Sequence, residues 1–379
     1  MGVQFTGKAI PSVRQERVPF NERGGRLRGC LDAVSGRFPR FVFGGRVGAD
    51  ILPVFHFHDE GRADLEPKLR YLAENGYRSV TSEDIAQFVA GRLSHEPRRV
   101  GLCFDDAWAS LWTVAAPLLR AYGLTAIAYA IPGRIEDAEA RSNATPFVTW
   151  SELRALHASG VVDVQCHTYS HSRVFCSTEV VDYVTPGYRD TPFLNRPQLQ
   201  STPSLRFVAP EDLGAPLYTA RSRMSDARRI VFADDVDRRC VEHVAREGGA
   251  PFFDRRGWRA ELDAIVRGAH PDHAGARRPT PAVESAGSQR AAIEEELDRG
   301  RSMLNDKLGT RTINHACLPW GVSGSETAAA LRRLGFRTAF ANRLRGVHAV
   351  RRGDDPYWLK RLPNKHIFRL PGRGRRTFV

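Results

Sequence analysis

The segment RVGLCFDD, residues 99–106, decides the fold, because a run of apolar residues ends there in two adjacent carboxylates, Asp105 and Asp106. We predict a buried strand over Arg99–Phe104. Neighbouring strand residues point to opposite sides, so a bend at the strand end is needed to bring both carboxylates to one face. An Asp-Asp pair in this place is more often a helix N-cap beside a solvated neighbour, and that interpretation stays open.

Strands and helices alternate on both sides of this segment. Helices are predicted between the strands, the clearest of them with capping boxes that begin at Thr149 and Ser323. Such alternation indicates a parallel sheet, either a barrel or a doubly wound sheet, with all strand C-termini on one face. The further strands are predicted over Ile51–His58, Tyr77–Val80, Leu124–Ile131, Val161–Cys166, Thr312–Leu318 and Arg337–Ala341.

A second polar cluster, HTYSH from His167 to His171, follows the predicted strand Val161–Cys166. Two imidazoles four residues apart meet on one face if the backbone turns helically, and that spacing suits a single divalent ion. Alone, such a pair is more often a surface or capping feature. The case for a metal is stronger here because both polar clusters end strands of one alternating sheet. Two histidines and an aspartate supply three ligands and leave positions for water and substrate.

The order of these motifs resembles that of the polysaccharide deacetylase family, the NodB-homology carbohydrate esterases of family 4. Its Thr-Phe-Asp-Asp-Gly motif is matched by CFDDA at 103–107, its His-Ser/Thr-x-x-His motif by 167–171, and its third motif by ACLPWG at 316–321. The resemblance covers residues 50–171 and 290–363. It implies an α/β fold, a deformed (β/α) barrel with a long insertion. We place the barrel at 49–365 and the insertion at 172–289, with an irregular arm at 1–48 and a basic tail at 366–379.

The resemblance also implies a mechanism. Asp106, His167 and His171 become the metal ligands, and Asp105 becomes the general base. The implied metal is Zn²⁺, with Co²⁺, Ni²⁺ or Mn²⁺ as alternatives. Metal-bound water would attack the amide carbonyl while Asp105 takes its proton, and the metal with nearby N–H groups would hold the oxyanion.

The general acid has three candidates. The family's late Leu-x-Ile-x-x-His motif has no convincing copy, and His366 is only a loose match. A branch that resembles the biofilm-glycan deacetylases takes this histidine from the first strand. We therefore favour His58, with His56 as an alternative. The competing interpretation is that the histidine is buried and hydrogen-bonded to backbone and has no catalytic role. Pro319 and Trp320 are assigned to the substrate wall, since an aromatic face suits the apolar side of a sugar, although core packing explains them equally well.

Two departures from the family pattern concern the catalytic machinery. Ala107 replaces the family glycine after Asp106, and the third motif lacks the arginine that orients the catalytic aspartate in many members, so another group must do so.

The sequence of the insertion, residues 172–289, has no clear helical or strand periodicity. It follows the histidine motif directly, so we expect it to overhang the site and select substrate. Asp226–Glu247 contains predicted helix, and His270–Gln289 is a predicted loop in which a second metal site at residues 270–273 is the minor alternative. The candidate contacts for anionic groups, if they are not a solvated helix face, are Arg221, Arg223, Arg228 and Arg229.

Composition sets the outer limits. The 379 residues are 42% hydrophobic and carry a net charge of +13, which favours acidic partners such as anionic glycans, or indicates only an arginine-rich surface. No run of 18 apolar residues predicts a membrane span, and Met1–Arg28 lacks the apolar core of a secretory signal. Six cysteines without a CxxC pair predict reduced thiols, and we expect a cytoplasmic protein.

The sequence therefore predicts a metal-dependent hydrolase of carbon–nitrogen bonds that removes an N-acyl group, in the first place N-acetyl, from an amino sugar or glycoconjugate. The alternatives are another amide hydrolase on this fold, such as an allantoinase-like enzyme, and a catalytically weakened glycan-binding member. A nucleic-acid partner has only the net charge in its favour, because no nucleic-acid motif is present.

Overall fold

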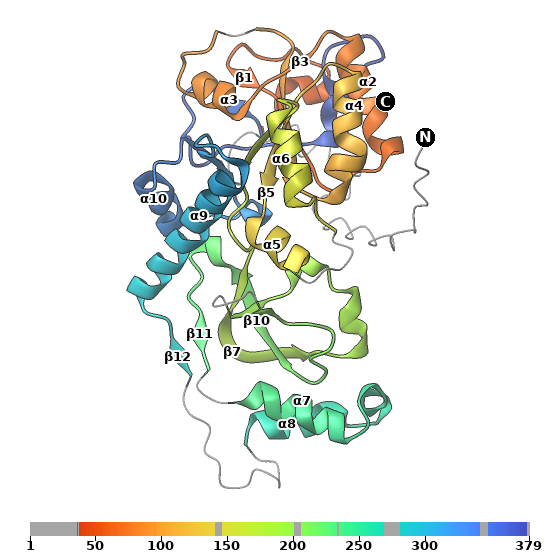
Figure 1. Cartoon of the computed structure of the whole chain (residues 1–379), viewed down its shortest axis with the longest axis vertical. Coiled ribbons are helices and arrows are strands. Elements are labelled where there is room, and N and C mark those ends of the chain that lie inside the picture. Colours follow the sequence, from red (N-terminus) through yellow and green to blue (C-terminus); the bar gives the residue numbers. More distant parts are fainter. Residues whose placement is uncertain are drawn as a thin grey trace.

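The central sheet of the chain is a curled, wholly parallel array of eight strands (Figure 1). The structure is a computed structural model that describes residues 36, 38–94, 96–140, 146–200, 206–232, 235–268, 281–341 and 348–376. The strands lie in the order β14-β13-β6-β5-β4-β2-β16, and β3 pairs with the start of β4. Their bounds are β2 (Val54–Phe57), β3 (Arg78–Ser79), β4 (Arg99–Asp106), β5 (Ala126–Ala130), β6 (Val162–Cys166), β13 (His315–Cys317), β14 (Thr338–Phe340) and β16 (Leu362–Pro363).

The segment that contains β16 closes the curl into a barrel. Leu362 pairs with Phe55 of β2, and three residues earlier Leu359 makes a parallel bridge to Phe340 of β14. One short stretch therefore joins the first and last strands of the sheet. The predicted deformed (β/α) barrel is confirmed, and the doubly wound alternative is not observed.

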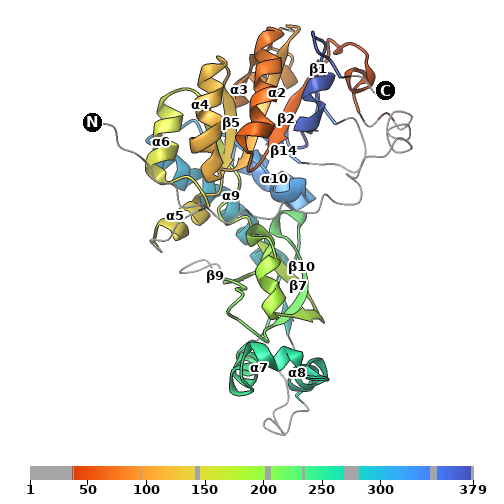
Figure 2. The same ribbon diagram turned by 90° about the vertical axis from the view of Figure 1, so that its right-hand side faces the viewer.

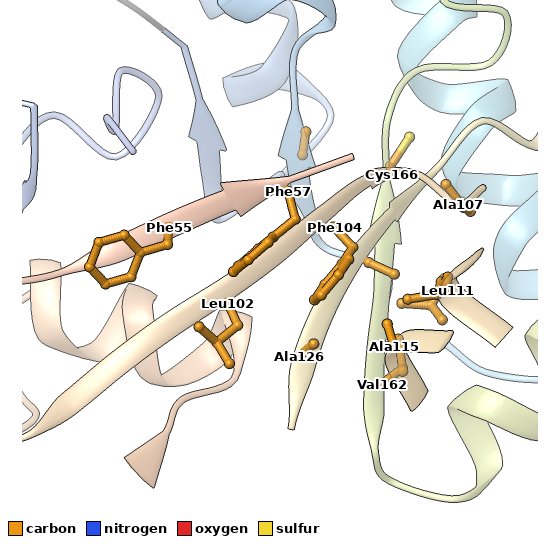
Figure 3. Close-up of a cluster of buried hydrophobic side chains, with 14 of the residues drawn as sticks. Phe55, Phe57, Leu102, Phe104, Ala107, Leu111, Ala115, Ala126, Val162 and Cys166 are labelled. Carbon is orange, nitrogen blue, oxygen red and sulfur yellow. The ribbon is translucent and has the colours of Figure 1, made fainter. Parts of the chain in front are cut away.

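Strand residues alternate between two apolar layers. Phe55, Phe57, Leu102 and Phe104 belong to the layer between the sheet and its covering helices, and Figure 3 shows them on one side of the strands. The rings of Phe57 and Phe104 stack with centroids 4.7 Å apart. Cys103 belongs instead to the layer inside the barrel. Because the side-chain period of a strand is two, this parity fixes which polar residues at the strand ends point inward.

Helices cover the outside of the barrel (Figures 1 and 2). The capping box predicted at Thr149 is confirmed, since Thr149 N–H donates to Glu152 and the Thr149 hydroxyl accepts from the Glu152 N–H. These helices are α2 (Arg62–Glu74), α3 (Ser82–Val89), α4 (Ala116–Ala121), α5 (Pro132–Ala140), α6 (Trp150–Ala158), α9 (Ala286–Leu308) and α10 (Ser325–Arg333).

The capping box predicted at Ser323 is wrong. Helix α10 begins at Ser325, and its N-terminal N–H groups donate to a residue of the insertion, Asp226, rather than to Ser323. A Cβ atom on Gly324 would lie 2.0 Å from the Asp226 carboxyl carbon, so the glycine makes room for this distant cap.

Two proline residues divide elements that the sequence predicts as continuous. The strand predicted over Ile51–His58 is split at Pro53 into β1 (Ile51–Leu52), which pairs with β15 (Val350–Arg351), and β2. The helix between β4 and β5 is interrupted by a π-helical turn at Leu111–Ala115, and α4 begins at Ala116, directly before Pro117. Proline has no N–H to donate, which weakens a regular ladder at both places.

The insertion forms a lobe that projects from the barrel (Figures 1 and 2). Its strands, absent from the sequence prediction, pair antiparallel, and its two helices lie at the far end. It has apolar clusters of its own, so it is a folded unit rather than a loop. The elements are β7 (Arg173–Tyr183) with β10 (Pro216–Ser222), β8 (Gln198–Gln200) with β9 (Arg206–Phe207), β11 (Ile230–Val231) with β12 (Ala282–Val283), and α7 (Val236–Arg246) with α8 (Trp258–Val266).

Two sequence expectations at the edges of the fold have a different outcome. The loop predicted up to Gln289 ends earlier, because α9 begins at Ala286, and residues 270–273 lie outside the described residues. Residues 366–376, expected as a basic tail, pack on the barrel, where Arg375 donates to backbone carbonyls of the segment 41–45. None of the described helices has both the length and the apolar character needed to cross a bilayer.

Candidate metal and catalytic site

Alternate strand residues point into the barrel, and this brings three polar side chains together at the carboxyl ends of the strands. Cys103 points into the barrel, so Asp105, two residues on, does as well. Phe57 pairs with Phe104, which sets His58 beside Asp105 on the neighbouring strand, with His58 Nε2 3.7 Å from Asp105 Oδ2. His167 follows β6 with the same parity. The sheet alone therefore collects His58, Asp105 and His167.

A bend brings in the second carboxylate, as the sequence required. Asp106 and Ala107 both have positive φ, 69° and 55°, so the chain reverses at the strand end. Asp106 Oδ1 then lies 3.3 Å from His167 Nε2 and 3.7 Å from His171 Nε2, while Trp108 Nε1–H donates to the other oxygen at 2.9 Å. The turn is thus kept although Ala107 stands where the related family has glycine.

Backbone strain is concentrated around this cluster. Among the described residues, seven non-glycine residues have φ in the left-handed region, and five of them lie here. Each costs about 1–2 kcal/mol relative to an ordinary backbone, and such strain persists only where the surroundings impose it. The five are Asp106, Ala107, Thr168, His171 and Trp320.

Asp106, His167 and His171 fit a divalent ion. All three are buried, and one ligand atom from each lies within 4.8 Å of the others. A tetrahedral ion with bonds of about 2.0 Å holds its ligand atoms about 3.3 Å apart, close to the two distances from Asp106 Oδ1. That oxygen accepts no hydrogen bond from any described residue, as expected of an atom that faces a cation.

The two imidazoles are prepared for this role in different ways. The Nδ1–H of His167 donates to the Cys317 carbonyl at 2.6 Å, which orients the ring and leaves Nε2 toward Asp106. Burial, together with the charges of His167 and Arg134, lowers the pKa of His171 to about 3. Its imidazole is therefore neutral at physiological pH, the form that binds metals.

The group that orients Asp105 is Arg361, which the sequence analysis did not identify. Its Nη1 and Nη2 donate to the two carboxylate oxygens at 2.6 and 2.7 Å; the Asp105 side chain is buried, and that of Arg361 is 11% exposed. Burial alone would raise the pKa of Asp105, but the charge and hydrogen bonds of Arg361 outweigh it and hold this pKa below its usual range. Arg361 lies in the closing stretch 359–363, whose two-residue strand gives too short a pattern for sequence reasoning.

A second set of metal-type residues, Asp105, His167 and Cys317, also clusters. We exclude it as a cation site because the Arg361 guanidinium occupies both Asp105 oxygens and lies 3.0 Å from Cys317 Sγ. A cation there would meet this positive charge directly.

Only one of the three candidate acids lies beside the carboxylates with an accessible side chain. The His58 side chain is 56% exposed and contacts Asp105. His56 packs edge-on against His58 and is only partly exposed, and this partial burial with the charge of Arg361 lowers its pKa to about 3. His366 packs against Phe38, and burial with the charges of neighbouring basic residues lowers its pKa to about 3. We therefore retain His58.

Exposed aromatic rings border the cluster. Trp320 is 37% exposed, and its ring centroid lies 4.2 Å from that of His171. Its Nε1–H donates to Asn195 of the insertion at 2.9 Å. Phe193, 38% exposed, belongs to the same 3₁₀ turn, Phe193–Asn195. Pro319 is buried, a position that fits the core-packing interpretation of this residue.

The insertion meets the barrel at an arginine that the sequence analysis did not identify. Arg134, buried in α5, stacks on Phe207 at 3.2 Å and donates to the Ser170 carbonyl. Three of the four arginines proposed for anionic groups are instead used within the fold. Arg223 forms a buried ion pair with Glu284, Arg228 donates to the Glu284 carbonyl, and Arg229 donates to the Gln198 carbonyl.

Residues 92–190 match the family model described as polysaccharide deacetylase. Two curated relatives, the poly-β-1,6-N-acetyl-D-glucosamine N-deacetylases of Escherichia coli strains K12 and O157:H7, are each 28% identical over 115 residues. The match covers 28% of this chain but only 17% of each relative.

Solved structures of similar shape include the deacetylase domain of BpsB from Bordetella bronchiseptica, with 18% identity, a TM-score of 0.47 and coverage of 77% of this chain and 88% of that one. IcaB from Ammonifex degensii has 18% identity, a TM-score of 0.47 and coverage of 84% and 94%. A de-N-acetylase from Aggregatibacter actinomycetemcomitans has 15% identity, a TM-score of 0.48 and coverage of 81% and 97%.

The family match and the geometry concern the same residues. The matched segment contains the two carboxylates at the end of β4 and the two imidazoles that follow β6. Residues 92–190, which carry the candidate site, are therefore similar to the polysaccharide deacetylase family.

Proposed function

We propose that the chain is a metal-dependent N-deacetylase that hydrolyses the N-acetyl group of an amino sugar within a glycan. The observation that carries this proposal is the ion-sized gap between Asp106, His167 and His171, with Asp105 on one side and an accessible His58 beside it. A divalent ion bound there, Zn²⁺ in first place, supplies a Lewis acid that acidifies the attacking water and polarises the amide carbonyl.

The protein's own groups then move the protons. Asp105 accepts the proton of the attacking water, and Arg361 keeps this carboxylate ionised and fixed in orientation. The ion pair makes Asp105 a weak base, which suits a water whose acidity has been raised. His58, exposed and 3.7 Å from Asp105, donates a proton to the departing amine.

Glycan recognition is assigned to the exposed aromatic faces next to the imidazoles. Trp320 lies against His171, and the exposed Phe193 belongs to the insertion turn whose Asn195 accepts from Trp320. Aromatic faces suit the apolar faces of sugar rings, and two of them can hold consecutive units of a chain. The name of the Escherichia coli relatives makes poly-β-1,6-N-acetyl-D-glucosamine oligomers the first substrate to test.

The test is acetate release by the zinc-loaded protein from N-acetylated oligosaccharides of different linkage, with cyclic amides as the competing substrate class. Asp105→Asn should keep the ion and lose turnover. Asp182→Asn, an exposed aspartate of the insertion that pairs with Arg259, is the matched control and should be fully active. Ring opening of cyclic amides without acetate release would contradict the proposal, as would parental turnover by Asp105→Asn.

A further inference from the structure

One buried carboxylate outside the catalytic cluster is bonded to the segment that carries both imidazoles. Glu296 lies in the middle of α9, more than 120 residues after His171 in the sequence. Its backbone carbonyl accepts from Tyr169 N–H at 2.8 Å, and its carboxylate accepts from Ser170 N–H at 2.9 Å and from the Ser170 hydroxyl. Three hydrogen bonds from the centre of the histidine motif thus end on one residue.

This segment needs an external support because its backbone is strained. Thr168 has φ of 63° and His171 has φ of 54°, each costing about 1–2 kcal/mol. Within the segment, His171 N–H donates to the Thr168 hydroxyl at 3.1 Å. Hydrogen bonds that involve a charged group contribute about 1.5–3 kcal/mol each, enough to offset such strain.

Helix α9 is built to come this close. A Cβ atom on Gly300, one turn after Glu296, would lie 2.9 Å from both Cys166 Sγ and Tyr169 N. Only glycine lets the helix backbone approach the histidine segment so closely. On the outer side, the Arg299 guanidinium stacks on Tyr169 at 4.0 Å.

The same residue adjoins the neck of the lobe. Helix α9 runs from the lobe to the barrel (Figure 1), and Glu296 shares a small cavity with Arg223. Arg223 N–H donates to the carbonyl of Ser172, directly after His171, and its side chain pairs with Glu284 at 2.6 Å. The positively charged side chain of Arg223 therefore lies near the Glu296 carboxylate, but the hydrogen bonds between Glu296 and Ser170 are kept.

We propose that Glu296 is a positioning residue of the metal site. By holding Tyr169 and Ser170 it fixes the relative positions of His167 and His171, so the affinity of the site for a divalent ion depends on it. This inference rests on the proposed function for the existence of the ion site, and it adds a residue from a distant helix that touches neither ion nor substrate.

The experiment is a calorimetric Zn²⁺ titration of the metal-stripped full chain, with the absorption spectrum of the Co²⁺ form as a second readout. Glu296→Ala should weaken Zn²⁺ binding by about 10–100-fold, as expected for groups that support ligands. Glu296→Gln should recover part of this loss, because its amide oxygen still accepts one hydrogen bond. Glu295→Ala, the half-exposed neighbour that pairs with Arg299, is the control and should bind as the unaltered chain does.

Unaltered Zn²⁺ affinity and Co²⁺ spectrum in a Glu296→Ala variant that melts cooperatively would refute the inference. If Glu296→Ala fails to fold, the Zn²⁺ affinities of Glu296→Gln and Ser170→Ala test the inference instead. Weaker Zn²⁺ binding in both variants supports the positioning role of Glu296, and parental affinity in both refutes it. Failure of the unaltered chain to bind Zn²⁺, Co²⁺, Ni²⁺ or Mn²⁺ would remove the proposed function, and this inference with it.

Discussion

Replacing Arg361 by methionine should shift the acidic limb of the activity profile upward. The Arg361–Asp105 pair is bidentate, with distances of 2.6 and 2.7 Å, and largely removed from solvent, with side-chain exposures of 11% and 4%. Two unit charges about 4 Å apart at an effective dielectric constant of about 20 interact by about 4 kcal/mol, equivalent to about 3 pKa units. Without this charge, burial dominates and raises the pKa of Asp105.

The sign of the pH effect follows from the depressed pKa. In the unaltered protein Asp105 is ionised throughout the neutral and mildly acidic range, so its contribution to stability is present above the unfolded pKa and is lost only in strong acid. In Arg361→Met the carboxylate becomes protonated at a higher pH. The base is then lost progressively as the solution becomes mildly acidic, and kcat/KM falls with it.

The assay is kcat/KM for acetate release as a function of pH, with Zn²⁺ content measured at each pH so that loss of the ion is not mistaken for loss of the base. Removing one partner of a buried pair should also destabilise the fold by about 3–5 kcal/mol, measured by urea unfolding. Arg332→Met is the control: this exposed arginine pairs with Asp355 at 3.3 Å, and its loss should cost less than about 1 kcal/mol. An Arg361→Met profile with the parental acidic limb would refute the reasoning.

Three further outcomes are expected. His58→Gln should lower kcat by about 10²–10⁴-fold at full Zn²⁺ content, and unaltered turnover would exclude it as the acid. Trp320→Ala should raise KM for oligosaccharides about tenfold, equivalent to about 1.4 kcal/mol, with little change in kcat; an unchanged KM would remove it from the substrate wall. Asp226→Ala removes the cap of α10 and should lower unfolding stability by about 1–2 kcal/mol in a urea titration, and no loss would mean that solvent caps the helix equally well.

The strand ends were predictable because the relevant information is local. The apolar runs around β4 and β5 and the shorter pattern Val161–Cys166 at β6 predicted those three strands within two residues of their observed bounds. Two-residue elements such as β16, and the antiparallel strands of the lobe, were missed. Their stability comes from partners distant in the sequence rather than from their own pattern.

The sequence by itself determined the parallel α/β sheet and the positions of Asp105, Asp106, His167 and His171 at strand ends, because strand parity and strand direction are properties of a local pattern. Only the tertiary structure decided that Arg361 holds Asp105, that Glu296 holds Ser170, and that Asp226 caps α10. Each of these is a polar contact between residues about 100 or more positions apart. Closure of the barrel and docking of the lobe bring such partners together. No local pattern or motif in the sequence predicts which arginine or carboxylate will lie beside a given residue.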